Sequence, residues 1–280
     1  MPGTLYLCAT PIGNLQDMSP RVIETLAQVD LIAAEDTRNS IKLLNHFEIK
    51  TPMTSYHEYN RVEKAKELIY KLQRGMDIAL ITDAGTPAIS DPGEVLVAMC
   101  HEAAVPVTSL PGPAALIVAL TLSGLPTRRF CFEGFLPSDK KEKKLILEEL
   151  AGETRTIILY EAPHHLVRTL EELRETLGDR RVTLCRELTK KFETVLPTTL
   201  DKALEMYKEE APRGEYVLVV EGKSLAGKQK EARASLMEMS IEEHMDIYEK
   251  QGMNRKDAMK QVAKDRGVGK REIYQYLIEN

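Results

Sequence analysis

Apolar, strand-like runs alternate with helix-like stretches along most of this chain, and this alternation constrains the fold more than any other feature of the sequence. The runs TLYLCAT, DLIAAE, MDIALIT and VPVTSL are each followed by a stretch with helical spacing. Strands that alternate with helices form a mostly parallel sheet covered by helices. The runs are apolar at consecutive positions, as strands buried on both faces require. We therefore expect residues 1–124 to form an N-terminal α/β domain.

The pattern changes twice after residue 124. Gly124 and Pro126, in LSGLPTRRF, stop the preceding helix. The strand-like runs RFCFEGF, TRTIILYEA, RRVTLCREL and GEYVLVVEG follow, with helical stretches between them, and predict a C-terminal α/β domain at 125–223. Beyond it we expect only helices, at about 229–250, 254–266 and 270–279, which form a tail at 224–280.

Charge is distributed unevenly along the chain, with a positive excess in the last part of the tail. The chain carries a net charge of −5, whereas residues 251–280 hold seven lysines and arginines against four acidic residues. Ala263, Gly267 and Ile273 have the spacing of a helix-turn-helix, with a small residue, a turn glycine and an apolar anchor. The tail is therefore either a nucleic-acid-binding module or a small helical bundle that only caps the protein.

The four cysteines form no C-x-x-C pair, and three of them lie in apolar strand-like runs. This usage indicates small buried hydrophobic residues in a reducing compartment. No run of about 18 apolar residues suggests a membrane span. We expect a cytoplasmic protein with no membrane partner and no metal site.

Three loops that follow strands of the first domain combine glycine, proline and small residues. They are ATPIGN, DAGTPAISDPG and LPGPAA. Proline fixes the backbone and glycine permits close approach to a ligand, and ligands bind at the carboxyl ends of parallel strands. Taken singly, each loop is equally a structural turn, and none is a G-x-G-x-x-G or Walker A motif. The EDTR segment also has two interpretations, because Asp36 either belongs to a functional site or caps the next helix.

The ordered motifs together carry a resemblance. The series ATPIGN, EDTR, YHEYN, DAGTPAISDPG, PGPAA, FEGFLP, YEAPHHL, RELTK and RGEYVLVVEG, spread over residues 4–222, resembles the tetrapyrrole methylase superfamily of S-adenosylmethionine enzymes. Within it, the series is similar to the ribosomal RNA small subunit methyltransferase I family. The resemblance implies a two-domain tetrapyrrole-methylase-like α/β fold, with the cofactor cleft between the domains and the helical tail appended. It also implies 2′-O-methylation of a cytidine ribose in the decoding region of 16S rRNA.

The resemblance implies a set of S-adenosylmethionine contacts from both domains. They are Pro11, Ile12, Asp83, Gly85, Thr86, Pro87, Ile89, Ala114, Ala115, Glu161 and Ala162. Thr86 stands where the superfamily usually has an acid. Two further positions depart from the usual pattern, Tyr59 where histidine is common and His165 where arginine is common.

Methyl transfer to a ribose hydroxyl requires positioning and, because the hydroxyl is a very weak acid, help with its proton. Asp36, Asp83, Glu161 and Glu187 are candidates for the base, and Lys190 either lowers the pKa of the alcohol or holds a phosphate. The resemblance favours a site at RELTK over an exposed, salt-bridged helix start, so the predicted catalytic residues are Glu187, Lys190 and Asp36. The predicted RNA contacts are Arg38, Arg128 and Arg129 in the cleft and Lys256, Lys270 and Arg271 in the tail.

The expected partner is 16S rRNA or the small ribosomal subunit, and the expected assembly is a homodimer, since closed symmetry is common in soluble oligomers. Two other functions stay open at this point. One is a tetrapyrrole (precorrin-like) methyltransferase of the same fold, which needs no nucleic-acid module. The other is a non-enzymatic RNA-binding or ribosome assembly factor, against which the intact cofactor loops argue. The sequence does not identify the modified nucleotide, the base, or whether the acceptor is free RNA or an assembled subunit.

Overall fold

The first sheet is parallel throughout and has helices on both faces. The structure is a computed structural model that describes residues 1–279, without the side chains of 228, 229, 231–233 and 279. The strand order is β3-β2-β4-β1-β5. The strands are β1 (Leu5–Cys8), β2 (Leu31–Ala34), β3 (Met53–Ser55), β4 (Ile78–Ile81) and β5 (Val107–Leu110). This confirms the parallel sheet expected from the alternation of apolar runs and helices.

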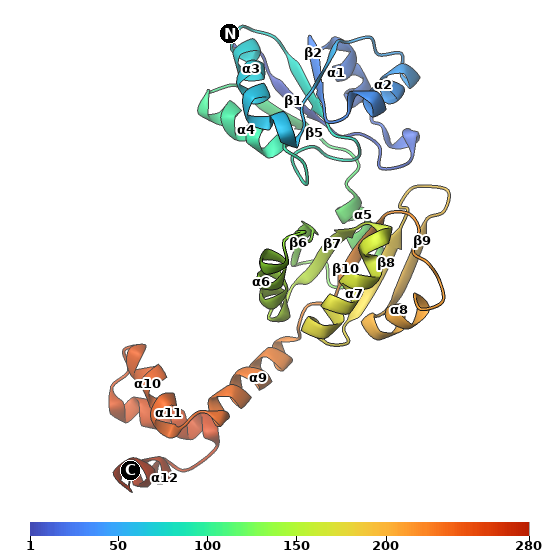
Figure 1. The fold of residues 1–280 in the computed structure, drawn as a ribbon. Coiled ribbons are helices and arrows are strands. Elements are labelled where there is room, and N and C mark those ends of the chain that lie inside the picture. The colour runs from blue at the N-terminus through green and yellow to red at the C-terminus, as the bar shows by residue number, and fades with distance from the viewer. Residues whose placement is uncertain (280) are drawn as a thin grey trace. The chain divides into compact units, whose positions relative to one another are not determined.

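Two helix pairs bury the two faces of this sheet (Figure 1). Helices α1 (Pro20–Gln28) and α2 (Thr37–His46) cover one face, and α3 (Arg61–Gln73) and α4 (Gly93–Glu102) cover the other. Leu5, Leu31 and Ile78 point to the α3–α4 side, whereas Cys8, Ile32 and Ala79 point to the α1–α2 side. Side chains that alternate between two apolar layers explain why these strands read as unbroken apolar runs.

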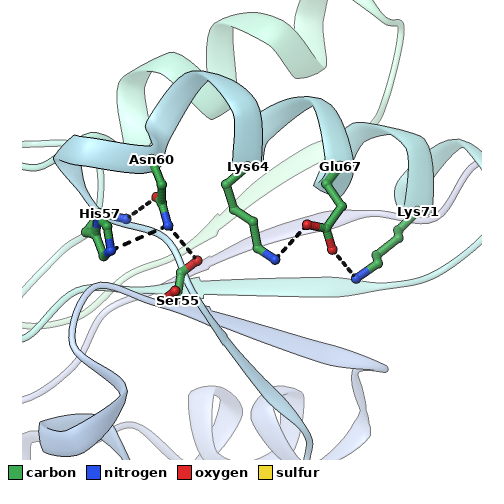
Figure 2. Close-up of polar contacts among 6 residues, drawn as sticks. All are labelled: Ser55, His57, Asn60, Lys64, Glu67 and Lys71. Carbon is green, nitrogen blue, oxygen red and sulfur yellow. Dashed lines mark hydrogen bonds and ion pairs between the residues drawn. The ribbon is translucent and has the colours of Figure 1, made fainter.

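The outer face of α3 carries ion pairs one turn apart. Glu67 accepts from Lys64 at 2.7 Å and from Lys71 at 2.6 Å, as Figure 2 shows. Such pairs on an exposed helix face stabilise a protein by at most about 1 kcal/mol each. The charge pattern of α3 is therefore that of a solvated helix face.

The second sheet is mixed. Its strand order is β6-β7-β10-β8-β9; β6 and β7 are parallel and the other neighbouring pairs are antiparallel. The strands are β6 (Phe130–Phe135), β7 (Thr156–Glu161), β8 (Arg181–Arg186), β9 (Thr194–Thr199) and β10 (Tyr216–Val220). Helices α6 (Lys140–Ala151), α7 (Pro163–Leu177) and α8 (Leu200–Met206) cover one face.

Helix α5 (Ala115–Leu122) covers the other face of the second sheet. Leu116, Ala119 and Leu120 pack with Ile158 and Val219, which belong to β7 and β10. The domain boundary predicted at residue 124 assigns α5 to the first domain, but its packing partners lie in the second sheet. Both sheets belong to one compact unit, residues 1–150 with 155–221. The division at 124 stays a prediction.

Two strands were not predicted from the sequence. Strand β3 has only three residues, all half-buried. Strand β9, TVLPTT, contains Pro197 and lies at the edge of the sheet, where proline is tolerated because one side of the strand needs no hydrogen-bond partner. Neither strand has the continuous apolar run that marks the others. Two 3₁₀ turns, η1 (Leu15–Asp17) and η2 (Glu58–Asn60), complete this unit.

The tail forms a second compact unit, residues 222–280 with the turn 151–154. Its helices are α9 (Leu225–Glu238), α10 (Ile241–Lys250), α11 (Arg255–Arg266) and α12 (Lys270–Glu279). The single helix predicted at 229–250 is wrong, because Ser240 and Glu243 form a capping box that starts a new helix. Val262, Ala263 and Ile273 form the small core of the tail with Met245 and Ala258.

Helices α11 and α12 have the predicted helix-turn-helix outline. Gly267 ends α11 in the left-handed conformation, with φ of 68°. Arg266 donates to the backbone carbonyl oxygens of Met239 and Ser240, which ties the end of α11 to the start of α10. Beside it His244 is fully buried, and burial lowers the pKa of its imidazole. No helix within residues 1–279 is long and apolar enough to cross a membrane.

Candidate active site

A cavity of about 340 Å³ lies where the carboxyl ends of the first sheet meet the second sheet. That volume is at the lower end of the roughly 300–1,000 Å³ typical of pockets for one small ligand. Nine of the eleven predicted cofactor residues line it: Ile12, Asp83, Gly85, Thr86, Ile89, Ala114, Ala115, Glu161 and Ala162. Pro11 and Pro87 do not. The structure thus brings together residues that are up to 150 positions apart in the chain.

The DAGTPAISDPG loop forms one wall and is fixed to the other two loops of the first sheet. Gly85 and Thr10 exchange two backbone hydrogen bonds, of 2.9 and 3.1 Å. Thr86 Oγ1 donates to the backbone oxygen of Pro113 at 2.9 Å. Gly85 has φ of 88°, and a Cβ there would lie 3.3 Å from Ile12. The three loops therefore form one rigid surface.

A carboxylate inside the same loop holds its second half. Asp91 accepts from the backbone nitrogens of Ala88, at 2.8 Å, and Gly93, at 2.9 Å. Ala88 has φ of 66°, an uncommon conformation for a residue with a side chain. Asp91 stabilises this strained turn. Helix α4 then begins at Gly93 with Pro92 as its N-cap.

Three acidic residues, Glu35, Asp36 and Asp83, lie just after the ends of β2 and β4. Glu35 accepts from the Thr82 hydroxyl at 2.6 Å, and Asp83 accepts from the backbone nitrogen of Asp36 at 3.2 Å. Partial burial, together with the charge of Glu35, raises the pKa of Asp83, although a hydrogen bond from Asn39 opposes the rise. Of the four candidate bases, Asp83 is the one that both lines the cavity and has a raised pKa.

Asp36 is the N-cap of α2 and lies outside the cavity lining. Its carboxylate accepts from Arg38, from the backbone nitrogen at 2.8 Å and from the guanidinium at 3.0 and 2.7 Å. These bonds lower the pKa of Asp36 to about 2. Because so weak a base takes up a proton poorly at neutral pH, the geometry supports the capping role rather than the predicted catalytic role.

The second sheet contributes Tyr160 and Glu161 from the end of β7. The Tyr160 hydroxyl accepts from the backbone nitrogen of Leu116 at 3.2 Å, and so caps the first turn of α5. Glu161 accepts from the Thr169 hydroxyl at 2.5 Å and from the backbone nitrogen of Ala162 at 2.8 Å. Both oxygens of this buried carboxylate therefore have partners on its own side of the cavity, which leaves it poorly placed to act as a base.

Lys190 is the cation of the cavity lining. Its ammonium donates to Glu187 at 2.9 Å and to Glu215 at 2.7 Å. Burial lowers the pKa of Lys190, but the hydrogen bonds to Glu215 and Glu187 outweigh burial and leave the pKa above its ordinary value. Lys190 therefore stays protonated. It lines the cavity, whereas its predicted partner Glu187 does not.

Glu187 does not line the cavity, but it holds Lys190 in place through their hydrogen bond. It has φ of 53° and accepts from the backbone nitrogen of Glu215 at 2.9 Å. The hydrogen bond from Glu215 is the largest effect and lowers the pKa of Glu187. The hydrogen bond from Lys190 lowers it further, whereas burial raises it. Glu187 is thus a fixed anion that acts through Lys190. Glu215 was missed in the sequence because its link to Lys190 spans 25 residues.

Two of the three predicted cleft arginines are not in the cleft. Arg128 and Arg129 precede β6, and the backbone oxygen of Arg129 accepts from Thr156 at the start of β7. The cavity lies at the opposite ends of these strands, at Phe135 and Glu161. The expectation that Arg128 and Arg129 line the cleft is therefore wrong. Arg38 follows β2 at the cavity edge of the sheet, but it is paired with Asp36.

The YHEYN motif forms the turn η2 after β3 (Figure 2). The Asn60 amide accepts from the backbone nitrogen of His57 at 2.9 Å and donates to the backbone oxygen of Ser55 at 3.4 Å. Tyr59, the departure from the family pattern, is 97% exposed. His165, the other departure from the usual pattern, is exposed in the first turn of α7. Neither lines the cavity.

A model of the family described as Tetrapyrrole (Corrin/Porphyrin) Methylases matches residues 4–204. The chain belongs to this family. A protein named Ribosomal RNA small subunit methyltransferase I, from Synechocystis sp., is 49% identical over 278 residues, which cover 99% of this chain and 98% of that protein. The protein of the same name from Escherichia coli O157:H7 is 43% identical, covering 99% and 95%. This tetrapyrrole methylase thus also belongs with the ribosomal RNA small subunit methyltransferase I proteins.

Solved structures show the same fold. Diphthine synthase superposes with a TM-score of 0.62 at 13% identity, over 81% of this chain and 94% of that one. Uroporphyrin-III-C-methyltransferase from Thermus thermophilus gives 0.55 at 17% identity, over 78% and 94%. Identities this low show the fold alone, and they do not favour a tetrapyrrole as the substrate of this family member.

This tetrapyrrole methylase is a methyltransferase that uses S-adenosylmethionine. The cavity suits such a cofactor. Ala114 and Ala115 leave space at the start of α5, while Glu35 offers a carboxylate to a ligand with cationic and hydroxyl groups. Among the residues that the structure describes, no cluster of histidine, cysteine and acidic side chains is placed to hold a metal ion.

Proposed function

We propose that this protein methylates the ribose 2′-oxygen of a cytidine in the decoding region of 16S rRNA, with S-adenosylmethionine as the methyl donor. The observation that carries the proposal is the 49% identity, over nearly the whole of both chains, to a protein named Ribosomal RNA small subunit methyltransferase I. The test is a map of ribose methylation in 16S rRNA from cells with and without the gene. Loss of one modified cytidine is expected, and an unchanged map would contradict the proposal.

The residues of the chain divide the work of the reaction. The cofactor supplies an activated methyl group when it is bound. The loops of the first sheet hold it, and the acceptor hydroxyl must lose its proton as the new C–O bond forms. Lys190, a fixed cation in the cavity wall, stabilises the negative charge that develops on the hydroxyl oxygen. Asp83 is the carboxylate best suited to take the proton, because it lines the cavity and partial burial raises its pKa.

Replacement of Lys190 separates this role from cofactor binding. Lys190→Ala is expected to lower kcat by about a hundredfold, the usual cost of losing one electrostatic donor, and to leave cofactor affinity nearly unchanged. Glu187→Ala should have a smaller effect in the same direction, since Glu187 acts through Lys190. Steady-state kinetics and calorimetry measure the two quantities. A fall in cofactor affinity that matches the fall in kcat would contradict the assignment.

The cofactor placement has its own test at Ala115. Ala115 lies in the cavity lining at the start of α5, so Ala115→Trp fills part of the space with an indole ring. This variant is expected to lose S-adenosylmethionine binding in calorimetry while it keeps a cooperative thermal transition. Ala115→Ser, which has nearly the original volume, serves as the matched control. Equal affinities of Ala115→Trp and the wild type would reject the placement.

We also propose that the protein is a cytoplasmic homodimer. Closed two-fold pairing is the commonest assembly of soluble oligomers. Exposed apolar side chains on α5, Ile117 and Leu122, offer a surface that a second copy would cover. Light scattering at micromolar concentration tests the assembly, and a monomeric mass would refute it.

A further inference from the structure

Phenylalanine is the unusual residue type of this chain, because none of its five copies belongs to the fully buried core. Phenylalanine is normally among the residues most often buried. Phe135 is 57% exposed and lines the cavity, and Phe192, 67% exposed, lies two residues after Lys190, which also lines it. Phe135 thus offers a bulky apolar ring that lines the cavity and stays open to solvent.

The backbone of β6 aims Phe135 at this cavity. The pairing of β6 with β7 shifts register between Phe132 and Gly134, and Gly134 has φ of 62°. In a regular strand, Phe132 and Phe135 would point to opposite faces, since side chains alternate. The extra residue puts both on one face, opposite Ile158 and Tyr160. Bulges often redirect a side chain beside an active site.

Both rings contact Tyr160. Phe132 lies edge-on to it with ring centroids 4.9 Å apart, and Phe135 lies edge-on at 5.6 Å. Phe132 is half-buried against α5, so it fills the apolar layer. Phe135 lies one step further toward the carboxyl end of β6, where the layer ends and the cavity begins. The Phe135 ring therefore packs against Tyr160 on one side and stays accessible at the cavity.

We propose that Phe135 is a stacking platform for an unpaired nucleobase of the RNA substrate at the mouth of the cavity. The inference rests on the proposed function. A cavity of about 340 Å³ holds one small ligand, so the rest of an acceptor nucleotide must lie over its rim. A base that leaves the RNA stack regains stacking on an aromatic side chain, which is the usual means by which proteins hold single-stranded RNA.

The test compares two phenylalanines at opposite ends of one strand. Phe135→Ala removes the platform. Phe130→Ala, at the start of β6 and 36% exposed, is the matched control. The measurements are affinity for small ribosomal subunits purified from cells that lack the gene, KM and kcat on those subunits, and S-adenosylmethionine affinity by calorimetry without RNA. Phe135→Trp retains an aromatic face and tests for rescue.

Phe135→Ala is expected to weaken subunit binding and raise KM by about tenfold or more, the effect of losing one base stack, with cofactor affinity unchanged. Phe135→Trp should behave like the wild type, and so should Phe130→Ala. The inference is overturned if Phe135→Ala matches Phe130→Ala, if cofactor affinity falls in step with KM, or if light scattering shows that the variant has lost a partner copy. If the wild-type protein methylates no subunits, the proposed function is overturned, and the proposed contact between Phe135 and a nucleobase is overturned with it.

Discussion

At the scale of single residues, two glycines hold the Lys190 cluster in place. Gly13 has φ of 153°, and a Cβ there would lie 2.4 Å from Cγ of Lys190. Gly214 has φ of 78°, and a Cβ there would lie 2.5 Å from Cγ of Glu187. Both positions pack directly against the side chains that we place near the acceptor. Position 214 needs glycine for two reasons: its backbone conformation is strained for a residue with a side chain, and a Cβ would collide with Glu187. A second glycine allows the effects of these two reasons to be measured separately.

Gly178 makes the separation possible. It has the same φ of 78°, but nothing lies within 4 Å of its missing Cβ. Alanine at either position should destabilise the protein by roughly 1 to 3 kcal/mol, because the conformation is strained for a side chain. Only Gly214→Ala should also lower kcat, by displacing Glu187 and with it Lys190. Urea unfolding and steady-state kinetics on both variants measure this, and equal kcat values would show that the cluster does not depend on Gly214.

Residue-level prediction from the sequence placed residues at the cavity where their position is decided locally, and their contact with the cofactor stays a prediction. Gly85 and Thr86 lie in a loop whose composition already indicated a ligand surface, and both line the cavity. It failed where the role depends on distant pairing. Glu215 meets Lys190 across 25 residues, and Phe135 reaches the cavity only through a register shift that no composition rule reveals. The error at Arg129 was avoidable, since a residue that precedes a strand lies at the end away from the site.

At the scale of elements, the start of α2 carries a pH-dependent contact. The pKa of Asp36 is about 2 in the folded protein against an ordinary value of 3.8. A carboxyl whose pKa is lowered by folding stabilises the fold above its unfolded pKa, and this contribution is lost as pH falls through the folded pKa. The Asp36–Arg38 pair should therefore act at neutral pH and disappear between pH 3.8 and about 2.

Two variants test this contact. In NMR titration, the Asp36 carboxyl should titrate near pH 2 in the wild type and closer to 3.8 in Arg38→Gln, which removes the partner and keeps the cap. Asp36→Asn retains a capping oxygen and should keep wild-type kcat, because Asp36 lies outside the cavity lining. A loss of kcat by a hundredfold in Asp36→Asn would restore the catalytic role predicted from the sequence.

Strands were predicted correctly from the sequence where they coincide with a continuous apolar run. The buried strands β1, β4, β7 and β10 were all expected, because each is a continuous apolar run. Strand β3 is too short, and β9 too polar, to show such a run. The break between α9 and α10 lies in helical-looking sequence and depends on one reciprocal cap, Ser240 with Glu243. The membership of α5 was unpredictable because an all-apolar helix does not reveal which sheet it covers.

At the scale of the whole molecule, positive charge gathers in the last part of the tail, whereas the rest of the chain is acidic. Residues 251–280 carry seven of the basic side chains against four acidic ones, while the chain as a whole carries −5. Lys256 lies in the first turn of α11, and Lys270 and Arg271 lie in the first turn of α12; all three are exposed. An acidic protein that binds RNA needs a basic surface, and Arg128 and Arg129 do not supply it at the cavity.

We therefore expect the tail to provide phosphate contacts. A protein that ends at residue 223 should fold and bind S-adenosylmethionine as the full chain does, because the tail forms a compact unit of its own. It should lose affinity for the small subunit. If Lys256, Lys270 and Arg271 each contact one phosphate, the log–log salt dependence should become shallower by roughly two to three units. Raising the subunit concentration should restore methylation, since the cavity is intact.

The triple variant Lys256→Ser, Lys270→Ser, Arg271→Ser keeps the tail folded, because none of these side chains belongs to its core. It should show the same change in salt dependence as the truncation, measured by binding at several potassium concentrations. A truncation that changes the salt dependence while the triple variant does not would place the contacts elsewhere in the tail. If both proteins bind the subunit as the wild type does, the tail is a structural cap, and the RNA-binding surface must be sought on the catalytic unit, beginning with the exposed lysines at the start of α6.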